Sequence, residues 1–138
     1  MRSNLYPPTL ILALLLSACG NTEEVTPDVT WEPALGENNL TTIDLGPLEL
    51  GGPMAQSPTV VATNNSLEAI IFELNCSFSG GHFAPLTCWS QQVPIEPGES
   101  TPPVSATILT NQSGTFSGSF QFIYDDEIAT FVIEATVQ

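Results

Sequence analysis

The stretch that decides the fold is FSGSFQFIYDDEIATFVIEATV, residues 116–137. Large apolar and small or polar residues alternate over residues 116–122, which is the two-residue period of a strand with one buried face. An acidic turn follows at residues 125–127, and the alternation then returns over residues 128–137. The pattern predicts an antiparallel hairpin. The residues predicted to share one face of its second strand are Phe131, Ile133, Ala135 and Val137.

Upstream of this hairpin, short apolar runs alternate with clusters of Pro, Gly, Asn and Ser. Turns recur about every ten residues, and helix signals are almost absent after residue 41, which favours a two-layer β fold. We therefore predict an all-β fold, an antiparallel immunoglobulin-like β-sandwich of about seven strands. The further predicted strands are 41–50 with an interruption at Gly46-Pro47, 58–63, 68–76, 91–95 and 104–110.

The charge balance is one-sided. The 138 residues include fifteen Asp and Glu, one His, and one basic residue, Arg2. Arg2 lies in the predicted export signal, so the exported chain has no Lys or Arg. A surface without basic residues cannot neutralise phosphates, which argues against nucleic-acid binding. It cannot hold anionic lipid electrostatically either, so a membrane anchor must act through lipid chains.

Residues 1–18 have the layout of a signal peptide, with Arg2, a short apolar run and small residues before Cys19. The apolar run of residues 9–18 is too short to span a bilayer, which needs about 20 residues. Leu16-Ser17-Ala18-Cys19 resembles the lipobox of bacterial lipoproteins. The resemblance implies cleavage before Cys19 and a diacylglycerol with fatty acyl chains such as palmitate on that cysteine. Gly20 after the cysteine implies the outer membrane by the enterobacterial sorting pattern.

Three segments are predicted along the chain. Residues 1–18 form the signal peptide, and residues 19–40 form the lipidated cysteine with an acidic, proline-interrupted tether. Residues 41–138 form the Ig-like domain. Trp31 is the one tether residue with a large enough apolar side chain to dock back on the domain.

Four motifs in order resemble one group of Ig-like modules. They are Ile43-Asp44-Leu45-Gly46-Pro47-Leu48, Thr63-Asn64-Asn65-Ser66, Ile95-Glu96-Pro97-Gly98-Glu99-Ser100 and Gly114-Thr115-Phe116-Ser117-Gly118. The group is the abnormal-spindle/hydin type, called choice-of-anchor D in bacterial surface proteins. The resemblance covers most of residues 41–138. It implies an immunoglobulin-like sandwich that serves as a structural or interaction module and has no shared catalytic site.

Two cysteines remain once Cys19 carries lipid. Cys76 and Cys88 are expected to form a disulfide in the oxidising cell envelope, since no basic residue is near to make a reactive thiolate. The loop between them offers two interpretations. Its aromatic residues cap the core together with Trp89, or it is a constrained recognition loop. The recognition residues would then be Gly80, Gly81, His82 and Phe83.

Catalytic signatures are missing from the sequence. There is no Gly-x-Ser-x-Gly motif, and any Ser-His pair would have to use His82. No catalytic residue, metal ligand or cofactor is therefore predicted. We expect a non-catalytic, lipid-anchored envelope protein that binds an unknown envelope protein or glycan. The alternatives are a Ca²⁺-responsive adhesin that uses Asp125, Asp126 and Glu127, and a carboxylate-based glycan hydrolase.

The excess of carboxylates makes a stability prediction. Folding brings like charges closer together, so repulsion between carboxylates is stronger in the folded state than in the unfolded chain. Protonation and salt screening weaken this repulsion, and both therefore stabilise the folded state. We expect residues 20–138 to melt at a higher temperature at about pH 5 than at neutral pH. Added salt should raise the neutral-pH melting temperature, because the Debye length shrinks to about 10 Å at 0.1 M. Calorimetry that finds a lower melting temperature at pH 5 and no salt effect would contradict this expectation.

Overall fold

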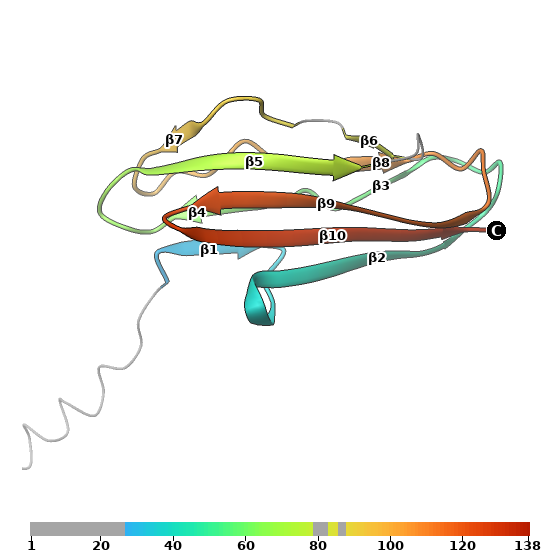
Figure 1. Ribbon diagram of the computed structural model, residues 1–138, viewed down its shortest axis with the longest axis horizontal. Helices are drawn as coiled ribbons and strands as arrows, with labels where there is room; N and C mark the ends of the chain where they lie inside the picture. The colour runs from blue at the N-terminus through green and yellow to red at the C-terminus, as the bar shows by residue number, and fades with distance from the viewer. Residues whose placement is uncertain (1–26, 79–82, 86–87) are drawn as a thin grey trace, which may run out of the picture.

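The computed structural model describes residues 27–78, 83–85 and 88–138 as an Ig-like β-sandwich (Figure 1). No helix in this described part is long and apolar enough to cross a membrane. Among these residues, the one helical element is a single 3₁₀ turn, η2 (Glu37–Asn39). The strands are β1 (Val29–Glu32), β2 (Leu40–Leu48), β3 (Ala55–Gln56), β4 (Val61–Asn64), β5 (Ile70–Phe78), β6 (Phe83–Pro85), β7 (Val93–Ile95), β8 (Ala106–Ile108), β9 (Gly114–Tyr124) and β10 (Glu127–Val137).

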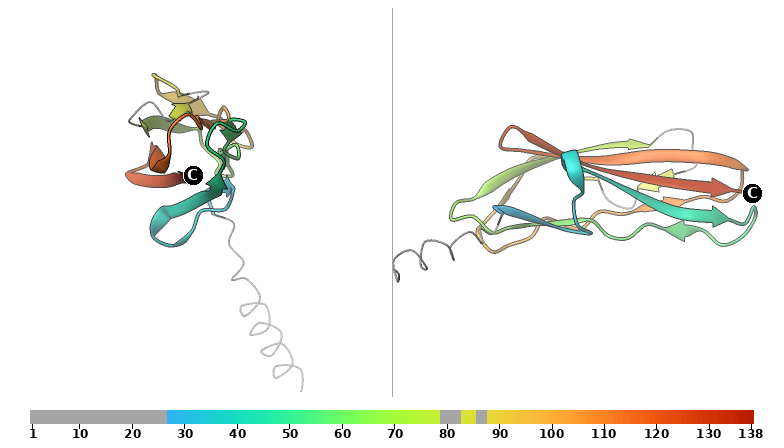
Figure 2. Two further views of the ribbon diagram at one scale, coloured as in Figure 1. Left: turned by 90° about the vertical axis from the view of Figure 1, so that its right-hand side faces the viewer. Right: turned by 90° about the horizontal axis from the view of Figure 1, so that it is seen from below.

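The strands form two layers (Figures 1 and 2). One layer is a five-stranded sheet in the order β2-β10-β9-β5-β7. The other contains the pair β1-β4 and the sheet β3-β8-β6. An antiparallel bridge between Val60 and Val104 joins these two parts of the second layer, with backbone hydrogen bonds of 2.8 and 3.1 Å. The described part of the molecule is elongated along its strands, as the right-hand view in Figure 2 shows.

The predicted hairpin is the centre of the larger sheet. Strands β9 and β10 pair over their full length, from Tyr124↔Glu127 to Gly114↔Val137. The four residues predicted to share a face of β10 are all buried, with exposures of 0 to 1%. The interior between the layers is rich in aromatic side chains. The largest fully buried ones are Phe72, Phe120, Phe122 and Phe131.

Gly118 lies on the buried face of β9, between Phe116 and Phe120, where a large residue would not fit. It pairs with Phe78 of β5, and the ring of Phe78 lies where a Cβ on Gly118 would stand. Any larger residue at this position would displace the ring from its contact with Phe120, where the centroids are 4.9 Å apart. The small residue therefore gives the Phe78 ring its place in the core.

One pairing differs from the predicted antiparallel sandwich. Strand β2 runs parallel to β10, from Leu40↔Thr130 to Leu48↔Val137, whereas the other paired strands are antiparallel. The predicted interruption at Gly46 is confirmed, because the register shifts there and Gly46 has a φ of +73°. Pro47 lies on β2, which is an edge strand. Within the described part, no further strand pairs with the outer side of β2, so a proline, which lacks an N–H, is tolerated there.

The predicted tether is wrong for the residues that form β1. Residues 29–32 pair with β4, and Val29 is 8% exposed. After Glu32 the chain crosses to the other layer through η2 and continues as β2. The tether prediction failed because this strand has only four residues between Pro27 and Pro33, too few to establish a period. The domain therefore begins well before residue 41.

Asn64 fastens the loops at one end of the sandwich. Its side chain is fully buried and donates to the carbonyl oxygens of Glu68 and Ile95 at 2.9 and 2.8 Å. Its carbonyl oxygen accepts from the backbone N–H and the hydroxyl of Ser66. A buried amide with these partners fixes three segments to one another, which explains a polar residue at this depth.

Candidate functional site

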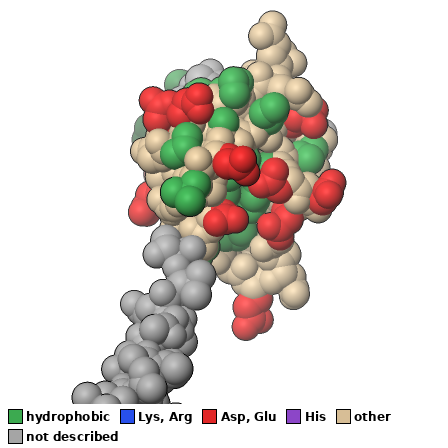
Figure 3. All heavy atoms as spheres, turned by 90° about the vertical axis from the view of Figure 1, so that its left-hand side faces the viewer, with side chains coloured by type: hydrophobic (Ala, Val, Ile, Leu, Met, Phe, Trp, Pro, Cys, Tyr) green, Lys and Arg blue, Asp and Glu red, His purple; other side chains and the backbone are tan. Residues whose placement is uncertain are grey.

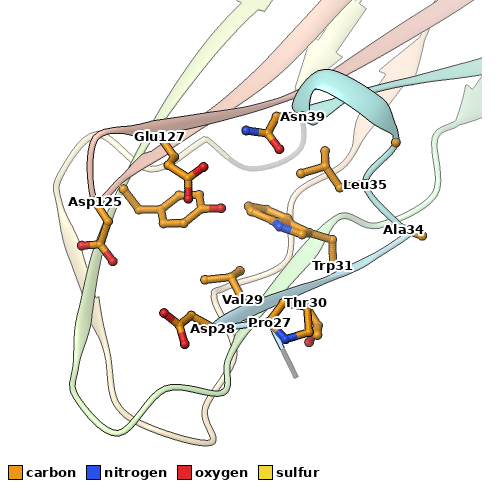
Figure 4. Close-up of a pocket in the computed structure, with 12 residues that line it drawn as sticks. Pro27, Asp28, Val29, Thr30, Trp31, Ala34, Leu35, Asn39, Asp125 and Glu127 are labelled. Atoms are coloured by element: carbon orange, nitrogen blue, oxygen red, sulfur yellow. The ribbon is translucent and has the colours of Figure 1, made fainter. Parts of the chain in front are cut away.

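The end of the sandwich that contains the β9–β10 turn carries an open hollow of about 550 Å³ (Figure 4). We call this end the hairpin end and the hollow the hairpin pocket. Its walls are residues 27–31 and 34–36, Asn39 of η2, and Tyr124, Asp125 and Glu127 of the hairpin. The volume lies within the range of about 300–1,000 Å³ that is typical of ligand pockets.

Strand β1 builds one wall because its side chains alternate. Val29 and Trp31 point toward the core, opposite Asn64 and Ala62 of β4, while Thr30 is exposed. Two hydrogen bonds from Asn65 hold this strand in place. Its backbone N–H donates to the Asp28 carbonyl at 2.7 Å, and its side-chain amide donates to the Thr30 hydroxyl at 3.0 Å.

The β9–β10 turn builds the opposite wall. Asp125 and Asp126 have φ values of 45° and 61°, the left-handed conformation that both central residues of a type I′ hairpin turn require. Asp tolerates this conformation better than most side chains do. The turn places Asp125 and Glu127 at the pocket, and Figure 4 shows both residues and Asp28 spread along the side of the pocket away from Leu35.

Trp31 and Tyr124 form the aromatic part of the pocket. Their ring centroids are 5.9 Å apart, and the Trp31 side chain hydrogen-bonds to Tyr124. Burial raises the pKa of the Tyr124 phenol above its ordinary value of 10.0, and the nearby charges of Glu127 and Asp125 raise it further. The hydrogen bond from Trp31 acts in the opposite direction. The phenol is therefore held in its neutral form beside two carboxylates.

Carboxylates are concentrated at the hairpin end (Figure 3). Those carried by its strand ends and turns are Asp28, Glu68, Glu96, Glu99, Asp125, Asp126 and Glu127. At the opposite end, the turns at residues 49–54 and 110–113 carry Glu49 alone. The described residues include no Lys, Arg or His, so none of these carboxylates has a cationic side chain beside it within the described part.

The cysteine prediction agrees with the structure. Cys76 at the end of β5 is bonded to Cys88, with the two Cα atoms 6.4 Å apart. Trp89 next to it packs against Phe122, with ring centroids 5.6 Å apart. The bridge therefore ties the loop between β5 and β7 to the core.

The predicted recognition loop is wrong for Phe83. This residue lies on β6, is 8% exposed and packs on Phe78 with ring centroids 5.1 Å apart. Phe83 therefore belongs to the core, as the capping interpretation expected, because an aromatic ring gains more from burial than from exposure. Gly80, Gly81 and His82 lie outside the described residues, as does Cys19.

Asp125, Asp126 and Glu127 form the hairpin turn that the sequence predicts. Among residues 27–78, 83–85 and 88–138, no group of three or more His, Cys, Asp or Glu side chains is arranged to hold a metal ion. The turn residues instead border two hollows. Asp125 and Glu127 line the hairpin pocket, and Asp125 also borders a second hollow, together with Asp126, beside Ile71 and Ile123.

Sequence reasoning missed the hairpin pocket as a site. Its residues come from two segments about ninety positions apart, one of them assigned to the tether, so no local motif unites them. The one available signal was Trp31, a large aromatic residue in a polar segment, and its predicted docking on the domain is confirmed.

Comparisons with known proteins extend only to the fold. No protein-family model matches the chain, and no curated protein matches it. The VesB protease of Vibrio cholerae aligns over 79% of this chain and 32% of its own, with a TM-score of 0.53 and 17% identity. The family 123 glycoside hydrolase of Clostridium perfringens aligns over 74% of this chain and 24% of its own, with a TM-score of 0.51 and 15% identity.

A third solved structure is the ASH/PapD-like domain of human CEP192. It aligns over 85% of this chain and 92% of its own, with a TM-score of 0.49 and 12% identity. This chain spans about a third or less of the two enzymes. At these identities the likeness concerns the sandwich architecture, and the activities of those enzymes belong to those proteins.

The Tyr124 environment makes a spectroscopic prediction. Residues 20–138 contain Tyr124 as their only tyrosine, because Tyr6 lies upstream. Ultraviolet titration of this chain should give a tyrosine midpoint above 10.0, and Glu127→Gln should lower it by removing a repulsive charge. Because the folded pKa is the higher one, the folded state keeps the proton that the unfolded chain loses. The unfolding free energy should thus fall as pH rises above about 10. A midpoint at or below 10.0 would contradict the described packing.

Proposed function

We propose that the chain is a non-catalytic, lipid-anchored envelope protein whose Ig-like domain binds another envelope component through the hairpin pocket. The observation that carries this proposal is the pocket itself. An open hollow at one end of a closed β-sandwich combines aromatic rings with carboxylates, and such convergence of apolar and polar groups is typical of binding sites.

The buried polar side chains support a role without catalysis. Five are buried among the described residues; Ser105 accepts from the Gln56 side chain at 3.4 Å, and the other four hydrogen-bond to backbone groups. Thr101 accepts from the Ala62 N–H at 3.0 Å, Ser57 accepts from the Ala106 N–H at 2.9 Å, and Thr110 donates to the Gly52 carbonyl at 2.6 Å. A hydroxyl committed in this way stabilises the fold, whereas a nucleophile needs an adjacent general base.

The proposed anchor would bring the pocket close to the membrane. Cys19 stands eight residues before Pro27, the first described residue and part of the pocket wall. Eight residues reach at most about 28 Å when fully extended. A lipid on Cys19 would therefore hold the hairpin end within that distance of the bilayer surface, so the partner is sought among components that lie at or near the membrane.

The proposal is tested by affinity capture of the tagged protein from its own envelope, with Cys19→Ala as the anchor control. We expect the wild type to fractionate with membranes and to retain a specific envelope component, with or without Ca²⁺. We expect Cys19→Ala to leave an uncleaved or mislocalised precursor, because the lipid can no longer be attached.

Three results would contradict the proposal. Cys19→Ala that is processed at the same bond and stays in the membrane would refute the anchor. Retention that depends on Ca²⁺ would favour the adhesin alternative. Shortening of an envelope glycan by the purified domain would make the protein a hydrolase.

A further inference from the structure

The hairpin pocket has a chemical character that the proposed function leaves unspecified. Asp28, Asp125 and Glu127 border it, and the Trp31 and Tyr124 rings supply its aromatic surface. Carboxylates attract a cation, and aromatic faces attract one as well, by about 0.5–2 kcal/mol depending on exposure. Both kinds of group favour a positively charged ligand.

The described part of the chain has no cationic side chain that could occupy this place. Its ranges 27–78, 83–85 and 88–138 contain no Lys, Arg or His. Within the described part, therefore, no side chain of the chain itself supplies a cation to the pocket carboxylates.

A metal ion is a poor match for this set of groups. No group of three potential metal ligands exists among the described residues, and two aromatic rings offer a metal ion no ligand that it prefers. An organic cation uses the whole lining. Its charged head can face Glu127 and Asp125, while its apolar stem packs on Leu35 and the Trp31 indole (Figure 4).

Resting on the proposed interaction function, we propose that the hairpin pocket binds an arginine side chain on a basic segment of a protein partner. A guanidinium is planar, so it can stack on an aromatic ring while its N–H groups bond to carboxylates in the same plane. Asn39 on η2 adds an amide at the rim that can bond to the backbone of the incoming segment.

The test is a titration followed by NMR of ¹⁵N-labelled residues 20–138, which include every described residue. The probe is acetyl-Gly-Arg-Gly-amide, and its matched control has citrulline, the neutral isostere of arginine, in place of arginine. We expect saturable shifts of the Trp31 indole N–H, identified by comparison with Trp89→Phe. The citrulline peptide should bind about tenfold more weakly, which corresponds to about 1.4 kcal/mol.

Two double variants with the same change in net charge locate the effect. Asp125→Asn with Glu127→Gln removes two carboxylates from the pocket, and Asn fits the left-handed conformation of residue 125. Glu49→Gln with Glu134→Gln removes two exposed carboxylates outside it. The first pair should weaken arginine-peptide binding at least fivefold, and the second should leave it within twofold.

Three results would overturn the inference: equal binding of the arginine and citrulline peptides, equal weakening by both variant pairs, or no saturable shift at Trp31. The proposed function is judged separately by envelope capture. A captured component that binds the pocket variant as well as the wild type would refute the arginine-binding pocket and would place the interaction on another part of the domain.

Discussion

The Trp31 indole connects the two layers of the domain. It belongs to β1 in the smaller layer, yet its ring lies 5.1 Å from Phe122 and 5.4 Å from Phe131, both in the five-stranded sheet. Phe72 and Tyr124 complete the contact at 6.4 and 5.9 Å. Truncating a core aromatic side chain of this size to alanine costs about 3–5 kcal/mol, a large share of the stability of a domain of about one hundred residues.

The same segment positions the binding surface. Trp31 is partly buried and packs against the core, the residues before it lie along β4, and the residues after it cross to the other layer. Asp28 is thereby placed on one side of the hairpin pocket and Asn39 on another, while the β9–β10 turn supplies Asp125 and Glu127. Stability at this end and the shape of the pocket therefore both depend on β1, which is held by Trp31, by its pairing with β4 and by the hydrogen bonds from Asn65.

The sequence predicted the elements with long regular patterns. The alternation of β9 and β10 identified the hairpin, its buried face and its acidic turn, and the two cysteines beyond Cys19 indicated their bond. The prediction from sequence failed where a strand was too short to show a pattern, or where the paired residues lie far apart in the chain. Strand β1 has four residues between prolines, and the parallel pairing of β2 with β10 joins residues about ninety positions apart, for which no local signal exists. Phe83 lies between the two cysteines in a stretch without a regular period, so no pattern indicated its strand β6.

The most direct measurement is urea unfolding of residues 20–138 with Trp31→Ala and Trp31→Phe. If the Trp31 contact connects the layers, alanine lowers the unfolding free energy by about 3–5 kcal/mol, and phenylalanine, which keeps an aromatic ring in the gap, restores much of the loss. Should the alanine variant prove too unstable to fold, the phenylalanine variant still reports a measurable loss of about 1 kcal/mol or more. An alanine variant that loses less than about 1 kcal/mol would contradict the account, because the layers would then be held together without Trp31.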